Sequence, residues 1–306
     1  MKIAGLGLAP LCAILAFAAA VPPVAADDFA TRFRQAAEAG RSAHCEKILA
    51  EWGRKEPNNP DFYIKGANWH VQRAKDGVRI TTKAAAPGKL VIADPTTGQA
   101  VGSISTSPPD PAWLKKAGKL LITGTEKCPK RLDIWLGVIQ VCDAAGEADA
   151  EINAMLRLAA YLNSKPTDLL GKEGKPYPEP VRTNIARQFS NYASRYYQLE
   201  SEAADRQLLA IATLTARAFP ETVYGHNIIG NYYAAVKPDY PLAIESYRKA
   251  LAIDPSDSLV WCNLGESCRR AEKFADAREA FGKVLELNDD LASVELARNL
   301  LAKLPP

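Results

Sequence analysis

The chain has 306 residues, and its 38 Lys and Arg residues nearly balance its 35 Asp and Glu residues, leaving a formal charge of +3. No basic stripe or run of like charges interrupts this balance, so nucleic acid and anionic membrane are not expected partners. The length is enough to bury a large core or to form an extended array of stacked helices.

The first 26 residues differ from the rest of the chain. Lys2 supplies one positive charge, residues 3–20 carry no charged side chain, and small residues fill positions 24–26. This layout is typical of a secretory signal peptide, and we expect cleavage after Ala26. An uncleaved membrane anchor is the alternative, which the paired prolines at 22 and 23 disfavour. The expected location is therefore periplasmic or secreted, with no membrane span after signal cleavage.

Residues 27–162 have the pattern of an N-terminal block of paired helices. Helical periodicity and turn residues predict helices over 29–39, 42–54, 61–74, 111–127, 132–145 and 148–162, with Gly40 and Gly146 at turns. The stretch 77–110 departs from this rhythm, because it is rich in Thr, Ser, Gly and Pro and contains short β-type runs. We expect a small β-hairpin or three-stranded insertion there.

A second break in the helical pattern covers residues 163–180. This stretch holds four prolines and two glycines, a composition that predicts a linker. It would join the N-terminal block to a C-terminal helical block over 181–306, which ends in a capping helix.

The C-terminal block repeats itself. Residues 240–255 match residues 274–289 at a distance of 34, with Tyr247 aligned to Phe281. Ahead of them, Gly230 aligns with Gly265 at a distance of 35, and we place the extra residue in the turn at 237–239. Gly265 and Ala277 are small, so the two helices of a hairpin can approach closely. Since one such hairpin cannot bury its apolar face alone, neighbouring hairpins must stack.

Five cysteines follow the signal segment, namely Cys45, Cys128, Cys142, Cys262 and Cys268. An odd number in an oxidising compartment leaves at least one thiol unpaired or paired between chains. The last two are six residues apart on one predicted helix and so face different directions, which rules out a bridge between them. We expect most of these cysteines to be small packing residues.

Chemistry-bearing motifs are missing from the sequence. It contains no phosphate-binding loop, no HExxH, no GxSxG and no calcium loop. The histidines His44, His70 and His226 lie far apart, and a His44–Cys45 pair does not provide the four ligands of a zinc site. We therefore predict no catalytic residues, no metal and no cofactor.

The 34-residue period with two helices per unit resembles the tetratricopeptide repeat family, most specifically over residues 223–290. The resemblance implies an all-α fold, a right-handed superhelix of helical hairpins, here carrying the small β-hairpin insertion. In that family the first helix of each hairpin lines a concave groove that holds an extended peptide or a partner helix. By this analogy the groove-facing positions are Tyr224, Asn227, Ile228, Asn231, Leu259, Cys262, Asn263, Glu266 and Arg270.

Six of these positions form the predicted partner-binding set: Tyr224, Asn227, Asn231, Asn263, Glu266 and Arg270. Amide side chains can pair with the backbone of an extended peptide. Family members that bind chaperones grip a terminal carboxylate with a lysine, whose place is taken here by Asn227 and Cys262, so chaperone binding is not expected. A solvated concave surface without a ligand is the alternative for these asparagines.

Three hypotheses for function follow. The first is an exported, bacterial-type scaffold or adaptor that binds a protein or peptide partner and is not an enzyme. The second is an exported enzyme with its active site near the 77–110 insertion, because loops often carry function. The third is a structural envelope protein that self-associates.

Overall fold

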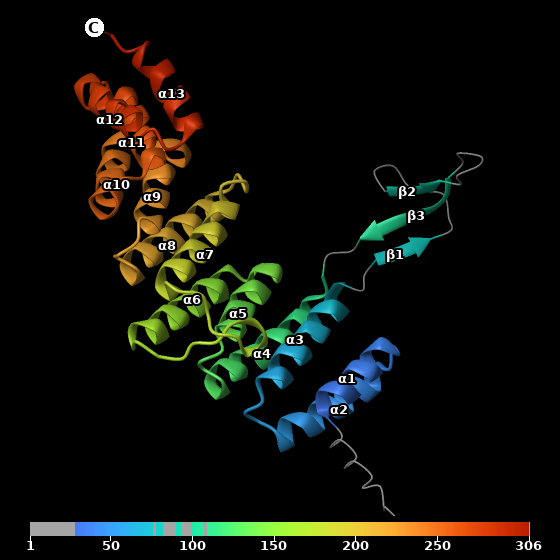
Figure 1. Ribbon diagram of the computed structural model, residues 1–306. Helices are drawn as coiled ribbons and strands as arrows, with labels where there is room; N and C mark the ends of the chain where they lie inside the picture. Colours follow the sequence, from blue (N-terminus) through green and yellow to red (C-terminus); the bar gives the residue numbers. More distant parts are fainter. Residues whose placement is uncertain (1–27, 76–77, 82–89, 94–99, 107–108, 306) are drawn as a thin grey trace, which may run out of the picture. The chain divides into compact units, whose positions relative to one another are not determined.

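The computed structural model describes residues 28–75, 78–81, 90–93, 100–106 and 109–305. The predicted signal peptide, residues 1–26, lies outside this range and stays a prediction. The chain divides into two compact units, Met1–Lys55 and Glu56–Pro306, and each is described by itself. Figure 1 labels their helices and strands.

The first unit contains a helical hairpin. Helices α1 (Phe29–Glu38) and α2 (Ser42–Lys55) are joined at Gly40, whose φ of 67° suits a residue without a side chain. Asp28 caps α1 by accepting a hydrogen bond from the backbone N–H of Ala30. Trp52 of α2 is fully buried and stacks on Phe29 at 6.0 Å between ring centroids. The hairpin predicted around Gly40 is confirmed.

The second unit consists mainly of consecutive helices that pack on their neighbours in the chain (Figure 1). They are α3 (Pro60–Lys75), α4 (Pro111–Lys127), α5 (Leu132–Ala144), α6 (Ala148–Asn163), α7 (Val181–Tyr196), α8 (Glu202–Ala218), α9 (Tyr224–Asn231), α10 (Tyr240–Ile253), α11 (Ser258–Arg270), α12 (Phe274–Leu287) and α13 (Leu291–Leu301). They pair as hairpins α3/α4, α5/α6, α7/α8, α9/α10 and α11/α12, with α13 as the capping helix. The predicted helical-repeat fold is confirmed, while the right-handed superhelix stays a prediction.

Four of the first helices begin in the same way. A proline lies three residues before the helix, and the fourth helical residue donates a side-chain hydrogen bond back to the carbonyl oxygen of that proline. The donor and acceptor pairs are Tyr63 and Pro57 at 2.6 Å, Trp135 and Pro129 at 3.0 Å, Asn184 and Pro178 at 3.0 Å, and Trp261 and Pro255 at 2.8 Å. The bond fixes the angle at which the chain enters each hairpin, so α3, α5, α7 and α11 are equivalent helices.

The two C-terminal hairpins depend on a glycine on the first helix that contacts an aromatic ring on the second. A Cβ atom on Gly230 would lie 2.5 Å from the Tyr247 ring, and one on Gly265 would lie 2.6 Å from the Phe281 ring. Both rings are buried, with exposed fractions of 1% and 0%. The predicted close approach is therefore confirmed, and the aligned residues make the same contact in both repeats.

The extra residue of the α9/α10 repeat is accommodated mostly within the helix. Residues Tyr232–Val236 form a π-helical turn that continues α9. The backbone N–H of Lys237 bonds to the carbonyl of Tyr232 at 3.0 Å, five residues earlier. A π turn is a one-residue insertion into an α-helix, so the placement of this residue in the turn at 237–239 needs correction: the insertion begins at Tyr232.

A three-stranded antiparallel sheet lies between α3 and α4 in the chain. Its strands are β1 (Val78–Thr81), β2 (Leu90–Ala93) and β3 (Ala100–Thr106), in the order β1-β3-β2. Ile104 is opposite Ile80 in one pair and opposite Leu90 in the other. The residues that connect the strands lie outside the described range.

The predicted linker 163–180 runs alongside the start of α5. Leu170 exchanges backbone hydrogen bonds of 2.8 Å with Lys130 and Leu132, and a short 3₁₀ turn covers Lys172–Gly174. Leu162 and Val181, on either side of the segment, belong to one hydrophobic cluster. The chain here is packed, and the division into blocks 27–162 and 181–306 stays a sequence prediction.

The five cysteines of the described chain form no disulfide with one another. Cys45, Cys142, Cys262 and Cys268 are buried, and burial raises the pKa of the last three thiols to about 11. A thiol with such a pKa stays protonated and unreactive at neutral pH. Their predicted role as small packing residues is confirmed.

Replacing Gly265 by Ala should destabilise the chain, because the new methyl group overlaps the Phe281 ring. The overlap should cost about 1–3 kcal/mol, which exceeds the gain of about 1 kcal/mol from higher helix propensity. Urea unfolding followed by circular dichroism would measure the change.

Gly282→Ala is the matched control, since an added Cβ there meets nothing within 4 Å. This variant should be as stable as the wild type or more stable. Equal stability of the Gly265→Ala and Gly282→Ala variants would contradict the proposed role of the glycine–ring contact.

Candidate functional site

The predicted partner-binding residues lie on α9 and α11, the first helices of the two C-terminal hairpins. Asn231 at the end of α9 joins three helices, because its Oδ1 accepts a hydrogen bond from the Tyr247 hydroxyl of α10 at 2.6 Å and one from Asn263 Nδ2 of α11 at 3.4 Å. The structure therefore brings Asn231 and Asn263 into contact. The sequence did not identify Tyr247 as the group that orients them.

Asn227 lies one helical turn before Asn231 on α9, on the same face. Its side chain is half-buried, and its Oδ1 is buried without a hydrogen-bond partner in the described chain. A buried acceptor left unpaired costs about 1–3 kcal/mol. Asn227 thus holds a buried acceptor that no described residue of the chain satisfies.

Glu266 of α11 occupies the position in its repeat that Asn231 occupies in the previous one. Arg269 Nε donates to its carboxylate at 2.7 Å, and so does Arg270 Nε at 2.7 Å. These hydrogen bonds hold the pKa of Glu266 below its usual range, and the bond from Arg269 has the largest effect. The pKa of Arg270 is raised by its hydrogen bonds to Tyr240 and Glu266. Two guanidinium groups against one carboxylate leave one net positive charge at the end of α11.

Other predicted groove positions serve the core. Tyr224 is half-buried and packs against the larger hydrophobic cluster. Ile228 and Cys262 are buried, with exposed fractions of 3% and 2%, so their placement on a groove surface was wrong. Leu259, in contrast, is 55% exposed on α11. The family analogy assigned whole helical positions, and neighbouring helices cover some of them.

The described residues contain no group of three His, Cys, Asp or Glu side chains placed to hold a metal ion. Within the same residues, no helix combines the length and apolar character needed to cross a membrane. The side chains of the insertion at 77–110 lie mostly outside the described range, so an active site there stays a hypothesis.

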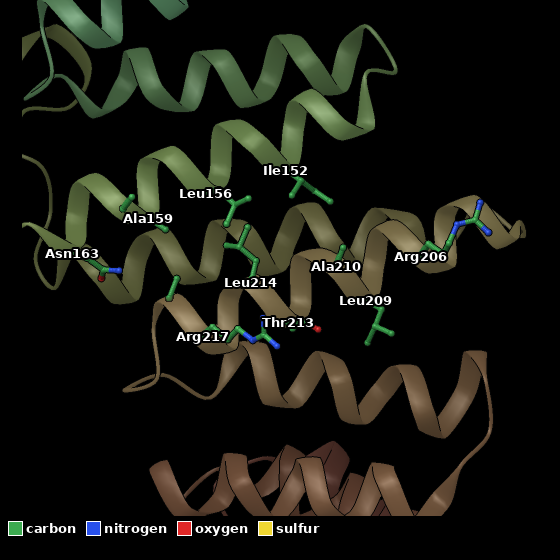
Figure 2. Close-up of a pocket in the computed structure, with 12 residues that line it drawn as sticks. Ile152, Leu156, Ala159, Asn163, Arg206, Leu209, Ala210, Thr213, Leu214 and Arg217 are labelled. Atoms are coloured by element: carbon green, nitrogen blue, oxygen red, sulfur yellow. The ribbon is translucent and has the colours of Figure 1, made fainter.

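A groove that the sequence analysis missed lies between α6 and α8, away from the predicted residues. It has a volume of about 670 Å³, and Figure 2 shows its lining. One side is formed by Ile152, Leu156, Ala159, Ala160 and Asn163 of α6, the other by Arg206, Leu209, Ala210, Thr213, Leu214, Arg217 and Ala218 of α8. Both sets recur at three- and four-residue spacings, so each is a continuous helix face. This spacing was the signal available in the sequence.

A buried carboxyl group holds α6 in place beside this groove. Glu151 of α6 has no exposed side-chain surface, and its Oε2 accepts a hydrogen bond from the Tyr196 hydroxyl of α7 at 2.6 Å. Its Oε1 lies 3.6 Å from Arg195, which also pairs with Asp143 of α5. Burial raises the pKa of Glu151 despite these partners.

Comparison with known families finds repeats at the C-terminus. Residues 238–268 match the family described as TPR repeat, and residues 258–291 match the family described as tetratricopeptide repeat. Residues 238–291 therefore match tetratricopeptide repeats. The resemblance inferred from the 34-residue period is confirmed for this stretch.

One curated relative is the peroxisomal targeting signal receptor of Eremothecium gossypii, 22% identical over 196 residues. The match covers 58% of this chain and 32% of that protein, so the chain spans about a third of its relative's length. Similar solved structures include YrrB, a TPR protein with an unusual peptide-binding site (12% identity, 83% and 97% coverage, TM-score 0.39). Another is MamA from Desulfovibrio magneticus RS-1 (14% identity, 57% and 86% coverage, TM-score 0.35).

Replacing Glu151 by Gln should flatten the pH dependence of stability. The raised pKa means that the folded state holds the proton more tightly than the unfolded state. Its contribution to stability is therefore complete below the ordinary pKa of 4.5 and is lost as the pH rises through the folded-state value. Each unit of pKa elevation corresponds to about 1.4 kcal/mol.

Glutamine keeps a carbonyl acceptor for Tyr196 but cannot ionise, so the melting temperature should fall less between acid and neutral pH. Glu147→Gln, an exposed change four residues earlier, is the control and should leave the profile unchanged. An unaltered profile for Glu151→Gln would show that this carboxyl group does not titrate differently on folding.

Proposed function

Because residues 238–291 are tetratricopeptide repeats, we propose that the chain is a protein-interaction scaffold that holds an extended peptide of a partner on α9 and α11. The observation that carries this proposal is the unpaired, buried Oδ1 of Asn227. We propose that the half-buried Asn227 side chain turns outward when a peptide binds, so that a peptide backbone N–H donates to its Oδ1.

Two further features support a peptide as the ligand. Asn263 uses one N–H in a long 3.4 Å contact with Asn231, which leaves its carbonyl oxygen for a second peptide N–H. Tyr247 holds the Asn231 amide in one orientation, so this part of the surface is arranged before a ligand arrives. Amides spaced along two neighbouring helices can follow a peptide backbone without reading its side chains.

The electrostatics of the site suggest where an acidic residue of the peptide binds. Arg269 and Arg270 exceed the charge of Glu266 by one, and Arg270 is 50% exposed. A carboxylate of the peptide near the end of α11 would complete a charge-balanced cluster. Leu259, exposed at the start of α11, supplies apolar contact at the other end.

The proposed location of the scaffold is the periplasm or the outside of the cell. This part of the proposal rests on the first 26 residues, with their single charge, uncharged stretch and small residues before Asp27. The partner is then another exported protein or a protein exposed at the cell envelope.

Peptides selected from a displayed random library against residues 27–306 should bind the wild type and bind the Asn227→Ala variant about tenfold more weakly. The Asn227 Oδ1 accepts no hydrogen bond within the described chain, so replacing this side chain by that of alanine removes no internal bond to that atom. A factor of ten corresponds to about 1.4 kcal/mol, as expected for a hydrogen bond to a buried acceptor. Calorimetric titration would measure it.

Asn263→Ala should weaken the same peptides, whereas Asn299→Ala is the control on an exposed position of α13 and should not. Melting curves would establish that each variant is folded. Selected peptides that bind all three variants equally would refute a peptide site on α9 and α11.

Expression of the full chain in a bacterial host should give a mature protein whose first residue is Asp27. N-terminal sequencing of the periplasmic fraction would test it. A chain that lacks residues 2–26 should remain in the cytoplasm. Recovery of the uncleaved full chain in membranes would support the anchor alternative instead.

A further inference from the structure

We propose that the groove between α6 and α8 is a second interaction surface. It binds a short amphipathic helix of a partner protein, and this helix carries a carboxylate near each of its two ends. The proposal does not depend on the peptide site, because α6 and α8 are second helices of their hairpins. The peptide site lies on first helices.

The floor of the groove is apolar, so it can bind the apolar face of an amphipathic helix. Leu156 is 52% exposed although it lies between the two helices, and Ile152 and Leu209 are half-buried. Alanines at 159, 160 and 210 keep the floor low between these larger side chains. Figure 2 shows Leu156 and Leu214 projecting toward one another across it.

The charges at the groove are of one sign. Arg206 lines one end and Arg217 the other, and none of the described lining residues is acidic. The guanidinium group of Arg217 makes no ion pair or hydrogen bond within the described chain. Arg206 has a 3.7 Å contact with Glu202, whose side chain is 94% exposed, and such a pair contributes little to stability. Both guanidinium groups can therefore bind carboxylates of a partner.

A polar donor accompanies the arginine at one end. The Oδ1 of Asn163 accepts a hydrogen bond from Arg182 at 2.8 Å, which turns its two N–H groups to other acceptors. Asn163 lies at the same end of the groove as Arg217 (Figure 2). A carboxylate bound there would pair with the positive charge of Arg217 and accept a hydrogen bond from Asn163.

The corresponding groove between α10 and α12, further along the chain, lacks these features. The pocket between α10 and α12 has a volume of about 280 Å³ and is lined by Asp276 and Glu279 as well as Arg248. Arg248 and Asp276 form a 2.9 Å ion pair that links the two helices. The α6/α8 groove is thus larger, apolar and uniformly basic, so the repeat fold alone does not account for it.

The spacing of the arginines selects a helical occupant. Arg206 and Arg217 are eleven residues apart on α8, which is three turns or about 16 Å. Carboxylates eleven residues apart on a partner helix likewise return to one face, with an apolar stripe between them. An extended peptide of that length would turn alternate side chains away from the apolar floor. A helix contacts the floor along its whole length.

A labelled helical peptide tests this inference. It carries two glutamates eleven residues apart, leucines at three- and four-residue spacings between them, and alanine and glutamine elsewhere. Fluorescence polarisation should show saturable binding to residues 27–306. The double variant Arg206→Glu, Arg217→Glu should bind at least about tenfold more weakly, as expected for the loss of interfacial charge pairs. A peptide with lysines in place of the glutamates should prefer the double variant.

Arg298→Glu on α13 is the control for a charge reversal away from the groove, and it should bind the glutamate peptide like the wild type. Leu156→Gln should weaken binding without unfolding the chain, because the side chain is half exposed. Equal binding of the glutamate peptide to wild type and double variant, or no saturable binding, would overturn the proposal.

Two results would contradict the proposal that this groove binds a helix of a partner protein. If Asn227→Ala weakened the helical peptide as much as the arginine changes do, the peptide would be bound at α9 and α11. If sedimentation showed that the wild type self-associates and the double variant does not, the groove would hold a second copy of this chain.

Discussion

The contact between a glycine on the first helix and an aromatic ring on the second determines the spacing of each C-terminal hairpin. It also positions the candidate site, because the Tyr247 ring that packs on Gly230 carries the hydroxyl that orients Asn231. In the following repeat Phe281 has no hydroxyl, and Glu266, the counterpart of Asn231, is held by arginines instead. The same glycine–ring contact is thus accompanied by two different sets of polar interactions on the first helices.

The repeated entry into each hairpin extends the pattern to the weaker upstream repeats. The hydrogen bond from the fourth helical residue to the preceding proline occurs with tyrosine, tryptophan or asparagine as donor. The chemistry of the donor varies while its reach and position are kept. This explains why α3, α5 and α7 are equivalent to α11 although their sequences match the repeat poorly.

Departures from regular repetition coincide with the surfaces proposed to bind partners. The π turn at Tyr232–Val236 follows the residues of the peptide site, and π turns are frequent at functional sites. The α6/α8 groove lacks the ion pair that closes its counterpart between α10 and α12. Glu151 ties α6 to α7, while other residues of the same helix line the groove. The regular packing of the helices stabilises the fold, and the local departures from it form the two surfaces that we propose bind partners.

The sequence alone determined the helical hairpins, the 34-residue period and the close approach of paired helices at small residues such as Gly265, because these follow from local periodicity and from side-chain size. By analogy with the resembled family it also placed Asn231 and Asn263 among the groove-facing positions, but it did not predict the contact between them. Only the tertiary structure decided which groove-facing positions are covered, as with Ile228 and Cys262, because burial depends on the neighbouring hairpin. The α6/α8 groove likewise needs two helices that 38 residues separate in the chain, and no local pattern encodes the distance between them.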